Sequence, residues 1–385
     1  MARFLPIPRP AGPRLAAAAL TLLLSCGTPA AWAAKPAPPL DPSAPLVPVA
    51  QSDGRVWNAV VVLPDGRMVL DYPAWTGGTG PSLTVRDADG TQRPYPDAGW
   101  HDATRDPARR FISVEGLHLT GDGALWVLDS GIGADGRAVP GGAKLARIDT
   151  TDGTVTRIVP IDPAVLRPGS HPAGVRIARG HGFVGDSGVA GLIVIDLGDG
   201  PGHGGQRRLL DHHPSLTAQR PIMTGGRVLR GANGHVAAVN VNHLEVSPDG
   251  QWLYYQPLCG PLYRIGTDLL TDTSVTGVEL DDGATLWYNT PPLGGMTVDR
   301  DGTLYFDDVS TGSIFRFTAG RIYQRIVVDP RLRWPAEPYV TPGGQLYVPV
   351  AQLDRTPRFD GGRAEVRWPL DLYRVDVGAL PPPAY

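Results

Sequence analysis

Three polar residues share one position in a repeated pattern of this chain, and their side chains suit the binding of a cation or a small molecule. Asn58, Glu115 and Asn242 each stand eight residues before the glycine of a recurring turn. A carboxylate and two amide oxygens are donors that Ca²⁺ takes among its about six to eight oxygen ligands. We therefore expect Asn58 and Asn242 to contact a ligand, and Glu115 with Asn242 to hold Ca²⁺ or another divalent cation. In the alternative interpretation the two amides cap strand ends and Glu115 pairs with an arginine.

Neighbouring positions add His171, His243 and Glu337 to the candidate site. His243 follows Asn242 directly, and Glu337 lies beside the corresponding position of the sixth repeat. Both are expected to bind the ligand. His171 comes immediately before the innermost strand of the third repeat, and its imidazole titrates near neutral pH. His171 and Glu115 are therefore the catalytic candidates for acid and base work.

The repeat that positions these residues is an apolar run, a Gly-centred turn and a second apolar strand. Successive turn glycines are 57, 57, 70, 52 and 42 residues apart, so each repeat has room for about four short strands, the content of one propeller blade. Innermost strands line an axial channel, and loops at its mouth leave room for a ligand. The sequence therefore predicts an all-β fold, a six-bladed β-propeller. The turn glycines are Gly66, Gly123, Gly180, Gly250, Gly302 and Gly344.

The last repeat lacks a fourth strand, which a segment before the first repeat can supply. After the strand Leu372–Asp376 only a Pro-rich end remains, whereas Pro45–Ala50 is rich in apolar residues. Pairing the two segments would join the chain ends and leave no open edge. We expect this strand to complete blade six, so that residues 45–385 form one propeller, which we expect to be a monomer.

Composition and charge limit the classes of partner that we expect this protein to bind. The chain of 385 residues has 49 Gly and 40 Pro, yet 42% of its residues are hydrophobic and 19% are charged, which argues against disorder. A formal net charge of −3 gives no reason to expect nucleic acid or an anionic membrane as a partner. A small-molecule ligand is the expected partner.

The first residues have the pattern of an export signal. Arginines precede the apolar run Leu15–Leu24, which is too short to span a membrane. Residues 1–33 are read as a signal peptide; in the alternative, a lipoprotein signal ends before Cys26 and leaves a lipid anchor there. Residues 34–44 then form a Pro- and Ala-rich linker. We expect an exported protein, periplasmic or extracellular, either free or anchored by lipid.

Several motifs together resemble the yellow / major royal jelly protein family. They are Trp126–Gly131, Gly185–Gly188, Leu192–Asp196, Leu253–Leu258 and Leu262–Ile265. The likeness runs from about Val56 to Asp376, and Asn242–Gly250 has the form found in bacterial members described as L-dopachrome tautomerase-related. The resemblance implies a secreted six-bladed propeller that binds a small molecule at the channel mouth. Some members resemble dopachrome-converting enzymes, and others are binding or nutritive proteins.

From this resemblance we expect a small aromatic or catechol-like ligand and, if the protein is an enzyme, an isomerase. Tautomerisation would use Glu115 as base, His171 as acid and Asn242 to stabilise charge. Asn242 also matches an asparagine of the gluconolactonase / regucalcin propellers, but Leu293–Met296 departs where that family has an acidic ligand. The alternatives are a metal-dependent lactonase and a non-catalytic carrier.

Overall fold

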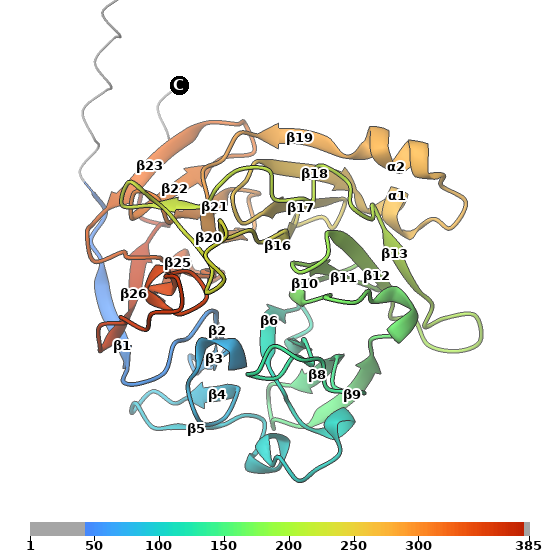
Figure 1. Ribbon diagram of the computed structural model, residues 1–385, viewed down its shortest axis with the longest axis horizontal. Coiled ribbons are helices and arrows are strands. Elements are labelled where there is room, and N and C mark those ends of the chain that lie inside the picture. The colour runs from blue at the N-terminus through green and yellow to red at the C-terminus, as the bar shows by residue number, and fades with distance from the viewer. Residues whose placement is uncertain (1–42, 381–385) are drawn as a thin grey trace, which may run out of the picture. The chain divides into compact units, whose positions relative to one another are not determined.

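The computed structural model describes residues 43–380, and their strands include six antiparallel sheets of four strands each. Figure 1 shows these sheets as blades arranged in a ring. The predicted all-β, six-bladed propeller is confirmed. The predicted signal segment 1–33, Cys26 and linker residues 34–42 lie outside the described residues.

In blades one to five the chain runs from the innermost strand to the outermost, and innermost strands of neighbouring blades contact one another. The strands are β2 (Val60–Val62), β3 (Met68–Asp71), β4 (Leu83–Arg86) and β5 (Gln92–Pro94) in blade one; β6 (Val114–Leu119), β7 (Ala124–Asp129), β8 (Lys144–Asp149) and β9 (Val155–Pro160) in blade two; β10 (Pro172–Ala178), β11 (His181–Asp186), β12 (Gly191–Asp196) and β13 (Gln206–Leu209) in blade three; β16 (Val241–Val246), β17 (Trp252–Pro257), β18 (Leu262–Gly266) and β19 (Thr285–Tyr288) in blade four; and β20 (Leu293–Val298), β21 (Leu304–Asp308), β22 (Ser313–Phe317) and β23 (Tyr323–Val328) in blade five.

Blade six is completed by the first strand of the described chain. It contains β24 (Tyr339–Val340), β25 (Gln345–Pro349), β26 (Leu370–Asp376) and, outermost, β1 (Val47–Ser52). β1 pairs antiparallel with β26, so that Val47 lies opposite Arg374 and Ser52 opposite Leu370. The strand lies two residues further along the chain than the predicted segment 45–50, and the predicted ring closure is confirmed.

The apolar core lies between the blades. Val69 and Val85 of blade one pack against Leu117 and Val127 of blade two, and all four side chains are buried. Burial of this kind stabilises by about 25 cal/mol per Å² of apolar surface. On the axis polar side chains meet, such as Arg176 of blade three and Glu337 beside blade six.

Two long connections lie outside the blades. Residues 210–240 link β13 to β16, and residues 350–369 link β25 to β26. They are joined by an ion pair between Arg227 and Asp360, 2.7 Å apart, and by a β-bridge between Arg230 and Asp360. In Figure 1 the first connection is yellow-green and reaches the second, which is red. We call the two connections together the lid. It contains β14 (Met223–Thr224), β15 (Arg227–Val228) and the 3₁₀ helix η5 (Leu353–Arg355).

The remaining helices are short and lie between strands. They are α1 (Thr267–Thr271), α2 (Gly277–Gly283) and the 3₁₀ helices η1 (Ala74–Thr76), η2 (Ala98–His101), η3 (Pro107–Arg109) and η4 (Pro163–Val165). Within residues 43–380, none of the helices is long and apolar enough to cross a membrane.

Candidate functional site

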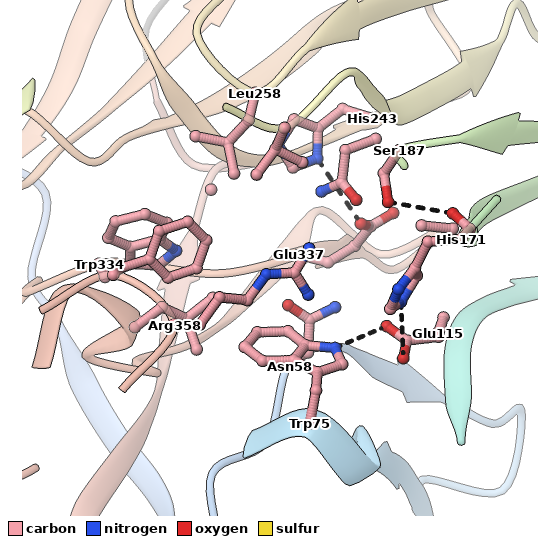
Figure 2. Close-up of a pocket in the computed structure, with 16 residues that line it drawn as sticks. Asn58, Trp75, Glu115, His171, Ser187, His243, Leu258, Trp334, Glu337 and Arg358 are labelled. Carbon is pink, nitrogen blue, oxygen red and sulfur yellow. Dashed lines mark hydrogen bonds and ion pairs between the residues drawn. The ribbon is translucent and has the colours of Figure 1, made fainter. Parts of the chain in front are cut away.

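The structure brings all of the residues proposed from the sequence to one cavity at the end of the channel that the lid covers. They are Asn58, Glu115, His171, Asn242, His243 and Glu337, and Figure 2 shows them around a common centre. Leu353, Arg358 and Phe359 of the lid line the same cavity. Its volume is about 30 Å³, which is room for about two water molecules. The roles of the six sequence-predicted residues toward a ligand stay a prediction.

Glu115 and Asn242 reach the cavity because each is the extra residue of a β-bulge. Pairing of β6 with β7 passes over Glu115, and pairing of β16 with β17 passes over Asn242. A bulge bends its strand and turns the extra side chain out of the normal alternation. In blade five the bulge falls at Gly294, the same position of the repeat. The shared position in the sequence thus becomes a shared position at the channel mouth.

Buried aspartates at the ends of the second strands fix the chain that enters the innermost strands. Asp71, Asp129 and Asp186 are all fully buried. They accept backbone N–H groups of Asn58 at 3.1 Å, Ser113 at 3.0 Å and His171 at 2.8 Å, respectively. Each aspartate therefore holds the segment that carries a candidate site residue in its own blade.

Glu115 is held by three neighbours. Its Oε2 accepts a hydrogen bond from Trp75 Nε1 at 3.0 Å, and its Oε1 accepts one from Ser113 Oγ at 2.7 Å. His171 Nε2 lies 3.3 Å from the same Oε1. The two donors fix the orientation of the carboxylate, and the imidazole is close enough to exchange a proton with it. The Glu115 side chain is 6% exposed and that of His171 15%, so a ligand in the cavity can reach both.

A second carboxylate and imidazole lie across the cavity. His243 Nε2 faces the carbonyl of Leu293 at 2.9 Å, so this nitrogen carries a hydrogen and donates it to the carbonyl. His243 Nδ1 lies 3.9 Å from Glu337 Oε2, and Arg176 Nη2 lies 2.9 Å from Glu337 Oε1. Burial alone would raise the pKa of Glu337, but the neighbouring His243 and the charge of Arg176 lower it below its usual value. Glu337 therefore stays ionised.

Glycines in blade five allow Glu337 to come this close. A Cβ on Gly294 would overlap the carbonyl oxygen of Pro335, and one on Gly295 would overlap the Cα of Glu337. The backbone N–H of Glu337 also donates to the carbonyl of Asn58 at 2.9 Å. The acidic ligand that the sequence lacks in blade five is thus replaced by bare backbone, against which the chain of blade six packs.

Sequence reasoning missed Arg358, Phe359 and the part that Trp75 takes in the site. Arg358 lies 4.6 Å above the ring of Trp75, and Phe359 contacts Trp75 edge to face with 6.4 Å between ring centres. The feature of the sequence that could have indicated Arg358 and Phe359 is the connection 350–369, which is much longer than a hairpin loop needs to be.

The donor set fits a metal ion poorly. Both oxygens of Glu115 already accept hydrogen bonds, and Oε1 also faces His171. Within residues 43–380, no group of three or more His, Cys, Asp or Glu side chains is arranged to hold a metal. Arg358 adds a positive charge to the same cavity. The predicted Ca²⁺ site at Glu115 and Asn242 stays a prediction.

The other end of the channel opens into a separate cavity of about 640 Å³. Arg176 divides the two, because it pairs with Glu337 at 2.9 Å and with Glu245 at 3.0 Å. Burial and the charge of Arg176 lower the pKa of His118 to about 3, and its Nδ1 accepts the backbone N–H of Ile177 at 2.8 Å. This histidine therefore joins blades two and three in its neutral form.

Comparison with known proteins gives a family. A model of the major royal jelly protein family matches residues 112–330, more than half of the chain. No curated protein has a significantly similar sequence.

Comparison with solved structures concerns the fold alone, because the identities are low. A putative gluconolactonase superposes with a TM-score of 0.53 and 12% identity, over 88% of this chain and 93% of that one. A gluconolactonase from Xanthomonas campestris gives 0.46 and 14%, over 86% and 99%. Virginiamycin B lyase from Staphylococcus aureus gives 0.46 and 15%, over 79% and 95%.

Proposed function

The chain belongs to the major royal jelly protein family, and we propose that it is an exported propeller which binds a small aromatic or catechol-like molecule in its axial cavity and moves a proton between carbon and oxygen of that molecule. The reaction is a tautomerisation of the dopachrome type. It consumes no oxidant or reductant, because the same proton count and electron count appear on both sides.

The observation that carries the proposal is the pair Glu115 and His171, with 3.3 Å between Oε1 and Nε2, inside a covered cavity. A tautomerase needs a base for the C–H proton and an acid for the oxygen. Glu115 takes the proton from carbon while the electron pair moves to the ligand oxygen, and His171 protonates that oxygen. Passage of the proton from Glu115 to His171 restores the starting state.

Two amides supply charge stabilisation. The side-chain amides of Asn58 and Asn242 line the cavity and make no hydrogen bond to any of the described residues. Their N–H₂ groups are therefore available to the oxygen on which negative charge develops, as in an oxyanion hole. The lid that covers this end of the channel keeps bulk water away from this step, so these dipoles act in a medium of low dielectric.

The test is turnover of L-dopachrome by the purified chain, followed by loss of its visible absorbance, with the product analysed after reaction in D₂O. Glu115→Gln should lower kcat by about 10²- to 10⁴-fold and leave the fold intact, because the change removes charge with almost no change of volume. Asp122→Asn, at an exposed turn of the same blade, is the matched control.

Two outcomes would sink the proposal. Saturable binding of aromatic molecules without turnover would leave a carrier. Activity that disappears with a chelator, and returns with Ca²⁺, would favour the metal-dependent lactonase.

A further inference from the structure

Arg358 is a cation without a partner in the cavity. Its guanidinium lies 4.6 Å above the ring of Trp75 and 5.7 Å from that of Phe359. Among residues 43–380, none forms a hydrogen bond or an ion pair with its side chain. Figure 2 shows the guanidinium directed toward the centre of the cavity, between Glu337 and Trp75. Stacking fixes its plane and leaves its N–H edge open.

Such a group is costly in this position. Buried polar groups are hydrogen-bonded as a rule, and a guanidinium has five N–H donors in a planar fork. Burial lowers the pKa of Arg358, and the charge of Glu115 opposes that shift only in part. The charged side chain therefore has no counter-ion in contact with it among residues 43–380.

The carboxylates of the site form no ion pair with Arg358. Trp75 and Ser113 donate hydrogen bonds to Glu115, and Arg176 donates to Oε1 of Glu337. Arg358 and the amides of Asn58 and Asn242 face the cavity without a hydrogen-bond partner among residues 43–380, and all three can donate hydrogen bonds.

We propose that Arg358 binds the carboxylate of the ligand, so that the site selects small planar aromatic acids over the corresponding neutral and amine compounds. This inference rests on the proposed function, because it names the class of molecule that the same cavity takes. A carboxylate matches the guanidinium fork with two parallel hydrogen bonds. An ammonium group would meet the positive charge of Arg358, which no described residue pairs, and be repelled by it.

The position of Arg358 on the lid links recognition to access. The closed cavity of about 30 Å³ is too small for an aromatic ring, so the lid must move to admit a ligand. Asp360, two residues further along, pairs with Arg227 at 2.7 Å and Arg363 at 2.8 Å, which ties the two connections together. An acid that enters therefore neutralises the half-buried cation of the lid and holds the lid against the bound ligand. Arg358 also lies outside residues 112–330, which match the family model.

The experiment compares three probes with one ring: benzoate, methyl benzoate and benzylamine. Their dissociation constants are measured by titration calorimetry with the full purified chain, the variant Arg358→Met, which keeps length without charge, and Arg358→Lys. Arg230→Met removes an exposed charge from the same lid and is the matched control. The parent and Arg230→Met should bind benzoate about 10- to 100-fold more tightly than methyl benzoate, the range expected of a charge-assisted hydrogen bond.

In Arg358→Met that ratio should fall to about 1, and Arg358→Lys should restore part of it, since the charge returns without the fork. Three results would each overturn the inference: no binding of benzoate by the parent, equal binding of acid and ester by the parent, or tightest binding of benzylamine. Dopachrome turnover in the same preparations separates the two proposals. Acid selectivity without turnover would support the role of Arg358 and refute the tautomerase. Turnover without acid selectivity would support the tautomerase and refute the role of Arg358.

Discussion

Replacement of Gly294 by alanine should destabilise the propeller by about 2–3 kcal/mol, near the upper end of the about 1–3 kcal/mol that overpacking costs. A Cβ at this position overlaps the carbonyl oxygen and carbon of Pro335, which are backbone atoms that no rotamer change can move away. The chain of blade six must therefore shift, and it carries Glu337 two residues later. The same strain should weaken ligand binding, because Glu337 leaves its place beside His243 and Arg176.

The assay is urea unfolding at pH 7, followed by tryptophan fluorescence, with the midpoint and slope fitted separately. Gly205→Ala is the matched control, because a Cβ there meets no atom within 4 Å and its φ is not left-handed. That variant should stay within about 0.5 kcal/mol of the parent. If both variants unfold at the same urea concentration, the close approach of blades five and six is not what requires Gly294.

Three further predictions concern the cavity and its surroundings. Trp75→Phe keeps a ring but removes the N–H that orients Glu115, so kcat for dopachrome should fall about 10-fold with little change of KM. Arg176→Met leaves two buried carboxylates without their cation and should cost about 3–5 kcal/mol in urea unfolding. Asp307 is fully buried, and neither of its oxygens has a partner among the described residues; burial, with a contribution from the charge of Glu337, raises its pKa well above the usual value. The folded state then binds this proton more tightly than the unfolded state, so the parent should lose stability as the pH rises above about 4, and Asp307→Asn should remove that part of the loss in unfolding measured at pH 5 and pH 8.

Exposed residues of the same types provide the controls. Trp368→Phe, Arg300→Met and Asp301→Asn change the same groups where solvent reaches them, and each should have an effect within about 0.5 kcal/mol. A Trp75→Phe variant with a changed KM and unchanged kcat would mean that the ring, and not its N–H, matters. A parent and an Asp307→Asn variant with parallel pH dependence would show that Asp307 does not titrate in this range.

The fold could be predicted because the blade pattern is local. Glycines of positive φ such as Gly66 and Gly123 make the tight turn between two strands, and only residues without a Cβ adopt that conformation easily. Their spacing counts the blades. The closing strand could also be predicted, since an unpaired edge in blade six needs a partner, although its bounds differ by two residues.

The candidate site could be predicted only where it follows the repeat. Glu115 and Asn242 share a position relative to their turns, and the bulges at that position bring both to the cavity. Arg358 has no equivalent in other blades, so periodicity carries no information about it. Its place depends on how residues 350–369 pack against residues 210–240, which is a contact between segments far apart in the chain.

The two arginines near the axis show why unpaired groups are the better guide to function here. Arg176 has carboxylates on both sides, Glu245 at 3.0 Å and Glu337 at 2.9 Å, and its charge is fully compensated within the protein. It holds the channel closed between the two cavities and fixes the ionised state of Glu337. Arg358 is half-buried at the cavity, yet no described residue completes its hydrogen bonds. The fold pairs Arg176 within the chain and leaves Arg358 unpaired at the cavity. We therefore expect Arg358 to bind an anion that comes from outside the chain.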